Sequence, residues 1–359
     1  MANQTYRVGI IGCGGMGRSH TRAWTAHPRA EVVAIMDIYE EATKRITDEY
    51  DVSAVYTDVD EMLAKEDLDI VSVTTWQGPR AEATVAAAKA GVKGIIGEKP
   101  MAASLGQADA MIAACEENDV KLVIGHQGRF APGNIETRRL VAAGAIGEPT
   151  TVHHSAKRHA GLLNTGTHAI DGWRFILSDP ETLWVIGQTS RESDRWERRT
   201  ICEDLCMGLV CFEGGARGIY EGDLPEPSVS MPRIAGTEGQ IRNGPDGTIL
   251  LQNGDAKGWQ SVTPPPQMKN QYDELIEWIE GDISDHRGSG VQARYTLEIM
   301  MAIYESLRIK NVVTMPMETK ELPLELMVND GTLPVLVEGK YDLRRPFEGQ
   351  TWQKPKKAK

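Results

Sequence analysis

The sequence predicts an α/β domain built on a doubly wound parallel sheet, followed by an α+β domain with a large, open and mostly antiparallel sheet. In the first third of the chain, short apolar runs alternate with helical patterns, which favours parallel strands joined by helices. From about residue 150, apolar runs follow one another with glycine turns between them, which favours antiparallel strands. A length of 359 residues also favours two domains over one.

The elements of the first domain can be assigned in chain order. The strands are short and rich in β-branched residues, and the helices follow glycines, a proline or a capping serine. The expected strands cover residues 6–12, 30–37, 68–75, 94–97 and 120–130, and the fourth of them runs into Glu98, Lys99 and Pro100. The expected helices cover residues 18–27, 81–91 and 104–118.

The second domain combines strands with amphipathic helices that would cover one face of its sheet. Strands are expected at residues 150–158, 182–188, 202–222 and 241–244, and helices at 167–177, 271–281 and 292–307. The charged run 191–199 is expected to be a solvated loop, and a loop that crosses into a neighbouring subunit's site is the alternative. We divide the chain into residues 1–125, 126–315 and a C-terminal extension, 316–359, that packs on the body and ends in disorder.

Composition excludes several classes of function. The chain has 39 Lys and Arg against 51 Asp and Glu, a net charge of −12, which argues against binding to nucleic acid. No apolar stretch approaches the ~18 residues of a membrane span, and the N-terminus lacks a signal-peptide pattern, so we expect a cytoplasmic protein without membrane contact. The five cysteines lack the spacing of zinc ligands, so we expect no metal.

A dinucleotide signature joins the first strand to the first helix. Gly12, Gly14 and Gly17 fit the spacing G-x-G-x-x-G, and Asp37 ends the next strand. The glycines permit a tight turn, close approach of the backbone to a diphosphate, and close packing of the helix, whose N-terminus favours negative charge. Asp37 would accept hydrogen bonds from ribose hydroxyls and repel a 2′-phosphate, so the sequence predicts NAD rather than NADP.

Polar side chains follow several strands at the edge of the sheet where ligands bind. Thr74, Trp76, Lys99 and His126 each come just after a strand, and the indole of Trp76 could either stack on a ring or pack in the core. The expected coenzyme contacts are Gly12, Gly14, Gly15, Met16, Gly17, Asp37, Ile38, Thr74, Thr75, Trp76, Arg80, Glu98 and Gln127.

Seven stretches resemble, in this order, the family of glucose–fructose oxidoreductase, inositol dehydrogenase and MocA (Gfo/Idh/MocA). They are "GIIGCGGMGRSH", "EKP", "GRF", "GAIGEP", "NTGTHAIDGWRFIL", "CFEGGARG" and "GTEG", and they span roughly residues 5–315. The resemblance implies a Rossmann domain, a second domain whose open sheet joins subunits into a homodimer or homotetramer, and sugar or polyol chemistry with NAD(P). It also suggests a cis peptide bond before Pro100.

The resemblance also implies the catalytic roles. The family pattern Asp-x-x-x-His-x-x-Asp reads Asn164, His168 and Asp171 here, so His168 falls on the catalytic histidine and Asn164 stands where an aspartate is common. Histidine suits a general base because its ordinary pKa is ~6.5, and the Lys99 ammonium would orient and polarise the reacting oxygen. The helix is expected to begin just before His168, with Asn164 on the entering loop. Asn164 can fix a hydroxyl or orient His168, but it cannot titrate.

Basic residues beside these motifs suggest how a small polyhydroxy substrate is held. Arginine can grip a carboxylate or paired hydroxyls, which favours a sugar acid or a richly hydroxylated sugar, while surface ion pairs are the competing interpretation. His153 and His154 alternate on one strand, so only one of them can face a pocket. The expected substrate contacts are Arg129, His154, Lys157, Arg158, Thr165 and Asp171.

Three functions remain open on the sequence alone. The first is an NAD-dependent dehydrogenase of a sugar, inositol or related polyol, which forms NADH. The second is a glycoside-processing enzyme that oxidises C3 transiently and eliminates the aglycone without net NADH, and the third is a nucleotide-sensing or assembly protein without turnover. The nucleotide signature, together with Lys99 and His168, favours the first.

Overall fold

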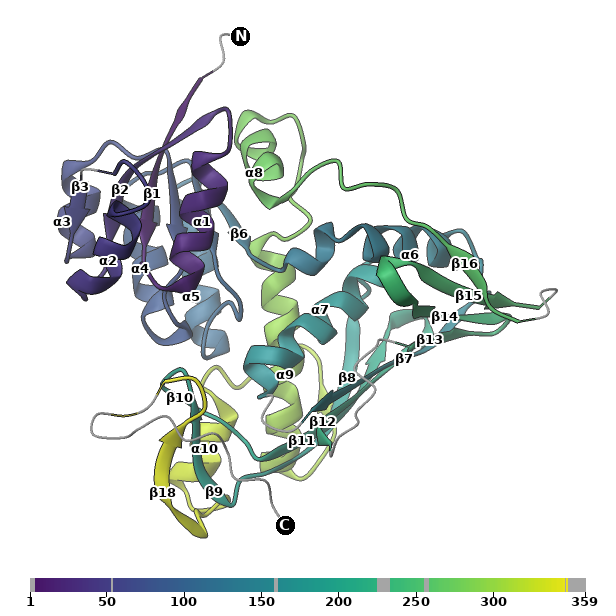
Figure 1. The fold of residues 1–359 in the computed structure, drawn as a ribbon. Coiled ribbons are helices and arrows are strands. Elements are labelled where there is room, and N and C mark those ends of the chain that lie inside the picture. Colours follow the sequence, from purple (N-terminus) through teal and green to yellow (C-terminus); the bar gives the residue numbers. More distant parts are fainter. Residues whose placement is uncertain are drawn as a thin grey trace. The chain divides into compact units, whose positions relative to one another are not determined.

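The computed structural model describes residues 4–52, 54–157, 161–224, 233–254, 258–345 and 347 (Figure 1). The chain divides into two compact units: unit 1 comprises residues 1–136 and 265–297, and unit 2 comprises residues 137–264 and 298–359. The expected boundaries at residues 125 and 315 differ from this division, because residues 265–297 add a helix to unit 1.

Unit 1 contains a six-stranded sheet in which all neighbouring strands are parallel. The strand order is β3-β2-β1-β4-β5-β6, so the direction of winding reverses between β1 and β4, where doubly wound sheets bind their ligands. This confirms the predicted class of the first domain. The strands are β1 (Tyr6–Ile11), β2 (Ala30–Met36), β3 (Ala54–Tyr56), β4 (Ile70–Val73), β5 (Gly94–Gly97) and β6 (Lys121–Ile124).

The helices of unit 1 bury an apolar core against this sheet. Trp24 of α1 and Tyr272 of α8 meet edge to face with ring centroids 4.8 Å apart, and both belong to the buried cluster around Ile10 and Ile35. Gly94 lets Leu275 of α8 approach β5 closely, which is why this late segment joins unit 1. The helices are α1 (Gly15–Thr25), α2 (Glu40–Thr47), α3 (Val59–Lys65), α4 (Gln77–Lys89), α5 (Leu105–Glu117) and α8 (Gln271–Glu280).

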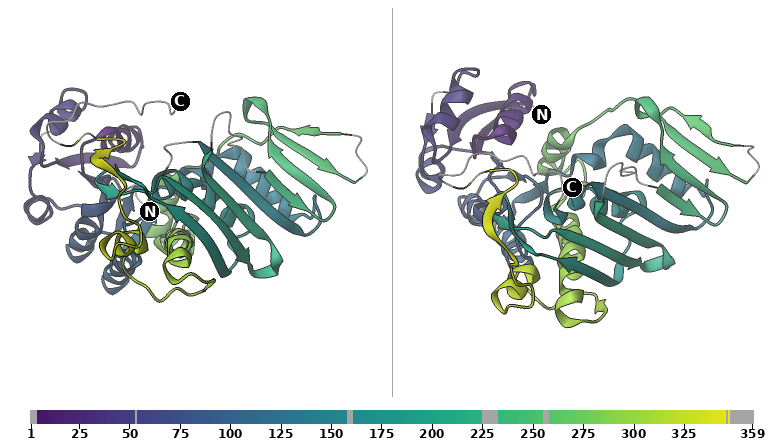
Figure 2. Two further views of the ribbon diagram at one scale, coloured as in Figure 1. Left: turned by 90° about the horizontal axis from the view of Figure 1, so that it is seen from below. Right: turned by 60° about the horizontal axis from the view of Figure 1, so that its bottom comes forward.

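Unit 2 contains a broad nine-stranded sheet and a separate three-stranded sheet (Figure 2). The strand order of the large sheet is β16-β15-β14-β13-β7-β12-β11-β8-β17, and all its pairs are antiparallel except β7 with β12. This confirms the predicted mostly antiparallel sheet. Its strands are β7 (Pro149–Lys157), β8 (Thr182–Ser190), β11 (Leu205–Phe212), β12 (Arg217–Leu224), β13 (Arg233–Gly236), β14 (Gly239–Asn243), β15 (Ile249–Asn253), β16 (Gln260–Val262) and β17 (Val313–Thr314).

Glycines in the large sheet let two helices pack close to it. A Cβ on Gly187 or Gly208 would collide with Ile303 of α9, and a Cβ on Gly218 would lie 2.7 Å from Trp173 of α7. The helices are α7 (Thr167–Ile176) and α10 (Pro323–Asn329), together with α6 (Pro132–Ala142) and α9 (Gly290–Ile309), each of which contains a boundary between the units.

The C-terminal segment joins the small sheet of unit 2. This sheet has the order β10-β9-β18 and consists of β9 (Ser193–Glu197), β10 (Thr200–Ile201) and β18 (Val337–Asp342). The last of these strands runs parallel to β9 and is drawn in yellow in Figure 1. The tail is therefore built into unit 2.

Short helical turns complete the described chain. They are η1 (Gln127–Phe130), η2 (Leu162–Gly166), η3 (Glu213–Gly215) and η4 (Pro245–Gly247). The expected strand 120–130 ends at Ile124, because η1 turns the chain away after it, and the expected strand 202–222 is a hairpin of β11 and β12.

Candidate active site

The turn between β1 and α1 has the steric features of a dinucleotide-binding loop. Gly12 has a φ of +92°, and a Cβ there would lie 2.9 Å from the backbone nitrogen of Thr75. A Cβ on Gly17 would lie 2.0 Å from the carbonyl oxygen of Gly12, so only glycine lets α1 come this close to the turn. A Cβ on Gly14 or Gly15 would meet nothing within 4 Å. The start of α1 therefore faces open space, where its free N–H groups favour a phosphate.

The main chain holds both oxygens of the Asp37 carboxylate. The N–H of Cys13 donates to Oδ2 at 2.7 Å, and the N–H of Tyr39 donates to Oδ1 at 2.9 Å. Each oxygen keeps a further lone pair with which to accept a hydrogen bond from a ribose hydroxyl.

A hollow of about 420 Å³ lies beside Asp37. Among the described residues that line it there are three carboxylates and no lysine or arginine. Ile38, predicted to contact the coenzyme, is an exposed apolar side chain on its wall. The hollow thus joins apolar surface to an acidic edge, which suits an uncharged ring attached to a ribose diol.

Arg80 ties together the loops that follow β4 and β5. Its buried guanidinium donates to the carbonyls of Thr75 and Pro100. The peptide bond between Lys99 and Pro100 is cis, which confirms the expectation. Arg80, which the sequence analysis predicted to contact the coenzyme, braces the loop that carries Lys99. Trp76 precedes the first residue of α4 and is partly exposed.

A buried chain of polar groups leads from α1 to the backbone of Lys99. The imidazole of His20 lies 3.2 Å from Ser72 Oγ through Nδ1 and 3.2 Å from Glu98 Oε1 through Nε2. The indole N–H of Trp24 donates to Ser72 Oγ at 2.9 Å. The N–H of Lys99 donates to Glu98 Oε2 at 3.3 Å. Glu98 therefore fixes the loop at Lys99 from within unit 1.

The pKa of Glu98 reflects two opposing effects. Burial raises this pKa, but the hydrogen bond and charge of His20, with the charges of Arg80 and Lys99, outweigh burial, so the pKa is lowered. Sequence reasoning missed His20. Its available signal was its place in α1, three residues after the last glycine of the motif.

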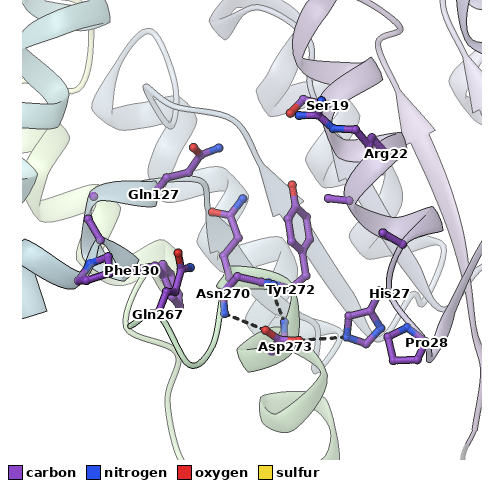
Figure 3. A pocket seen from close by; sticks show the side chains of 16 residues that line it. Ser19, Arg22, His27, Pro28, Gln127, Phe130, Gln267, Asn270, Tyr272 and Asp273 are labelled. Carbon is purple, nitrogen blue, oxygen red and sulfur yellow. Dashed lines mark hydrogen bonds and ion pairs between the residues drawn. The ribbon is translucent and has the colours of Figure 1, made fainter. Parts of the chain in front are cut away.

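A second hollow of unit 1, of about 790 Å³, lies beside α1 and α8 (Figure 3). Gln127 lines it, and one wall is fixed by His27, whose Nε2 lies 3.3 Å from Asp273. Arg129 follows Gln127 closely but is buried, and its guanidinium donates to the carbonyl of Arg287 at 2.9 Å. Arg129 thus braces unit 1 internally.

In unit 2 the motif that contains His168 lies at the start of α7. Its helix begins at Thr167, which confirms the expected start. Asn164 does not lie on a loop, since residues Leu162–Gly166 form the single π-helical turn η2, a feature often found at functional sites. His168 is exposed and Thr165 partly exposed, whereas Asn164 and Asp171 are buried.

The prediction of a solvated loop at residues 191–199 was wrong. Residues Ser193–Glu197 of this segment form β9, and Arg191, Arg195 and Glu197 are buried. The side-chain N–H of Asn164 donates to Glu197 Oε1 at 2.6 Å. Sequence reasoning missed Glu197 because a dense run of charges resembles solvent-exposed chain, while the tail strand that covers it lies far away in sequence.

The two histidines of β7 differ as the strand alternation predicts. His153 Nε2 lies 2.6 Å from Glu221 Oε2, whereas the ring of His154 stacks on that of Tyr220 with centroids 6.0 Å apart. Burial, and then the charge of His153, lowers the pKa of His154 to about 4, so this ring is neutral near neutral pH. Lys157 is the last residue of β7, and Arg158 and His159 lie outside the described residues.

The described residues hold neither a metal-binding cluster nor a membrane-spanning helix. They contain no group of three or more His, Cys, Asp or Glu arranged to hold a metal ion. In the same part of the chain, no helix is both long and apolar enough to cross a bilayer. All five cysteines are buried and free.

Known proteins share both the sequence motif and the fold. Residues 6–126 match the family model described as "Oxidoreductase family, NAD-binding Rossmann fold". D-apiose dehydrogenase of Paraburkholderia graminis is 26% identical over 276 residues, covering 73% of each chain. Inositol 2-dehydrogenase 3 of Saccharopolyspora erythraea is 31% identical over 227 residues, covering 59% of this chain and 65% of the relative. The crystal structure of the WlbA dehydrogenase from Bordetella pertussis, in complex with NADH and UDP-GlcNAcA, aligns with a TM-score of 0.74 at 23% identity over 88% of this chain and 100% of that chain.

The parallel sheet, its glycine turn and these matches define an NAD-binding oxidoreductase. The order of motifs along the sequence had suggested one family in particular. Residues 6–126 match the model of that family, Gfo/Idh/MocA.

Proposed function

We propose that the protein transfers a hydride between a secondary alcohol of a sugar, inositol or sugar-derived polyol and NAD. The observation that carries this proposal is the placement of one polar side chain in each unit, Lys99 in unit 1 and His168 in unit 2. Lys99 follows β5 on a loop fixed by Glu98 and Arg80, and His168 is exposed in the first turn of α7. The names of the relatives, D-apiose dehydrogenase and inositol 2-dehydrogenase, support a polyhydroxy substrate.

NAD fits the residues of unit 1. Gly14 and Gly15 leave open space for a diphosphate at the start of α1, and Asp37 offers two lone pairs to a ribose diol. NAD, when bound, supplies the hydride acceptor. We favour NAD over NADP because a 2′-phosphate at Asp37 would also meet the carboxylates of Asp60 and Glu82, which line the same hollow.

In this proposal the protein's own residues move the proton and hold the substrate. His168 accepts the hydroxyl proton during oxidation and returns it during reduction. The Lys99 ammonium orients the hydroxyl and stabilises the negative charge that develops on its oxygen. Asn164, His154, Lys157, Thr165 and Asp171 are proposed to bind substrate hydroxyls, while Arg80 and Arg129 are assigned to bracing.

A substrate panel tests this proposal. The purified protein is incubated with NAD and either D-apiose, inositol or levoglucosan, and NADH is followed by its absorbance. We expect net NADH formation with at least one of them. We expect His168→Asn or Lys99→Met to lower kcat/KM by ~10²–10⁴-fold, the usual contribution of a general acid or base or of an electrostatic stabiliser. Product release from a glycoside without net NADH would instead support the glycoside-processing alternative.

The outer face of the nine-stranded sheet supports a homo-oligomer. Ile186, Met207 and Ile219 are exposed apolar residues on the neighbouring strands β8, β11 and β12, and the strand register places them on one face. We propose that this face joins two copies of the chain in a dimer or tetramer. Light scattering on Ile219→Glu should show a smaller particle than the wild type if the face is the interface.

We also propose that the protein works in the cytoplasm. Its five cysteines are all buried and form no disulfide, as is usual for proteins of a reducing compartment.

A further inference from the structure

We propose that Glu197 is a positioning residue for the segment before His168. With Asn164 it forms an amide–carboxylate pair that replaces the single carboxylate of the family pattern. Arg344, in the C-terminal segment, holds the carboxylate of this pair. This inference rests on the proposed function, because the pair serves the general acid/base His168.

The pair is short, buried and shared with the tail. Asn164 and Glu197 are 8% and 3% exposed, and the Asn164 amide N–H donates to Glu197 Oε1 at 2.6 Å. The guanidinium of Arg344 donates to the same oxygen through Nε at 2.9 Å. On the other side, the thiol of Cys202 lies 4.0 Å from Glu197 Oε2. These two donors, an amide and a guanidinium, hold the buried carboxylate of Glu197 in one orientation.

A second carboxylate fixes the first residue of the same turn. Glu203 Oε1 accepts the N–H of Leu162 at 2.6 Å, and its Oε2 accepts the hydroxyl of Tyr304 at 2.7 Å. Leu162 begins η2 and Asn164 is the third of its five residues, so the first and the middle residue of this short turn are tied to buried acids. The turn leads directly into α7 and His168.

The hydrogen bond sets the polarity of the Asn164 amide. Because Nδ2 is given to Glu197, the carbonyl oxygen lies at the opposite end of the amide and can only accept hydrogen bonds. Asn164 thereby retains the accepting role of an aspartate, and the negative charge is moved to its neighbour, Glu197.

The pair also explains why position 164 does not carry an aspartate. In the Asn164→Asp variant, two carboxylate oxygens would face each other across the 2.6 Å separation that the amide now bridges. Two carboxylates so close cannot both stay ionised, since the pKa of one would be raised and it would bind a proton. With Glu197 at this place, an amide at position 164 is therefore favoured over an aspartate.

The tail holds the backbone around Glu197 as well as its side chain. Arg198 and Arg199, which follow β9, have φ values of +52° and +65°, and their N–H groups donate to the buried carboxylate of Asp342 at 3.1 and 2.7 Å. Asp342 ends β18, two residues before Arg344. The C-terminal segment thus stabilises a strained turn and the carboxylate beside it.

A carboxylate–amide swap tests the pair. Four proteins are compared: the wild type, Asn164→Asp, Glu197→Gln, and the double variant that carries both changes. The probe is the polyol of the D-apiose, inositol and levoglucosan panel that gives the fastest NADH formation. We expect each single change to lower kcat/KM by ~10–100-fold, the worth of a hydrogen bond to a charged group. We expect the swap to recover to within ~10-fold of the wild type, because it restores one amide and one carboxylate.

Further measurements separate positioning from loss of folding. Arg344→Ala, at a half-exposed side chain, should lower kcat by ~3–10-fold and leave KM for NAD unchanged, since the proposed coenzyme contacts lie in unit 1. Glu305→Gln is the matched control, because it breaks another buried carboxylate–arginine pair of unit 2, with Arg308, and the hydrogen bonds described for Glu305 go to Arg308 and Thr319. It should lower the thermal midpoint without changing kcat.

Each outcome decides between the claims. A swap no more active than the product of the two single losses, or Glu197→Gln with wild-type kcat, overturns the positioning role while leaving the proposed function intact. A wild-type protein that forms no NADH with any member of the panel overturns the proposed function itself, and the catalytic purpose of the pair with it.

Discussion

At the scale of single residues, backbone N–H groups of unit 1 fix the orientation of a key carboxylate. Asp37 is held by two backbone N–H groups before any ligand arrives, and one of them belongs to the glycine turn. Such a carboxylate loses little freedom on binding, so its hydrogen bonds to a ribose diol can contribute to affinity almost in full. In the proposed function the same fixed charge would oppose a 2′-phosphate.

Asp37→Ala should therefore weaken NAD binding by ~10–100-fold, the loss expected for hydrogen bonds to a charged group, and should favour NADP relative to NAD. Isothermal titration of both coenzymes measures this change. Asp60→Ala is the control, because it removes an exposed carboxylate from the same hollow and should change the affinity less than ~3-fold. Equal loss in both variants would mean that Asp37 has no special role.

The buried pair of His20 and Glu98 makes a prediction about pH. The pKa of Glu98 is lowered from its ordinary value of 4.5, so ionised Glu98 stabilises the fold above that value, and this contribution is lost as the pH falls through the lowered pKa. Glu98→Gln should be less stable than the wild type by ~2 kcal/mol at neutral pH, and the difference should shrink below pH ~4.5.

Urea unfolding at several pH values measures the Glu98 effect. Glu49→Gln is the control, because Glu49 pairs with Arg18 on the surface and its loss should matter little at any pH. A difference between wild type and Glu98→Gln that stays constant from neutral to acid pH would contradict the assignment.

At the scale of elements, the packing of α1 on β1 depends on two glycines with different duties. Gly17→Ala should destabilise the protein by ~1–3 kcal/mol, because its Cβ would meet the carbonyl of Gly12 at 2.0 Å. Gly14→Ala should leave the thermal midpoint within ~2 °C of the wild type, since its Cβ meets open space, and should weaken NAD binding instead. The two melting curves and two NAD titrations check this contrast, and identical behaviour of the variants would refute it.

The elements also show what the sequence could and could not predict. The glycine turn, Asp37 and the start of α7 were predictable because each depends on neighbours within a few residues. The buried β9 was not, since charges at 191–199 are stabilised by β18, more than a hundred residues away in sequence. The bracing roles of Arg80 and Arg129 could not be predicted from the sequence either, because their partners are backbone carbonyls, which carry no sequence signal.

At the scale of the whole molecule, the two units divide the proposed chemistry. Unit 1 offers the coenzyme contacts and Lys99, and unit 2 offers His168 with the Asn164–Glu197 pair. The C-terminal segment contributes to unit 2, because its strand β18 pairs with β9, the strand that carries Glu197. The proposed function requires that Lys99 and His168 act on the same substrate molecule.

A double-mutant cycle on Lys99 and His168 tests that central claim most directly. The measured quantity is kcat/KM for NADH formation in the wild type, Lys99→Met, His168→Asn and the double variant. If both side chains act on the same oxygen in one step, each single change costs ~10²–10⁴-fold and the double variant is little worse than the poorer single one. Wild-type turnover in either single variant, or losses that simply multiply, would contradict the proposed function.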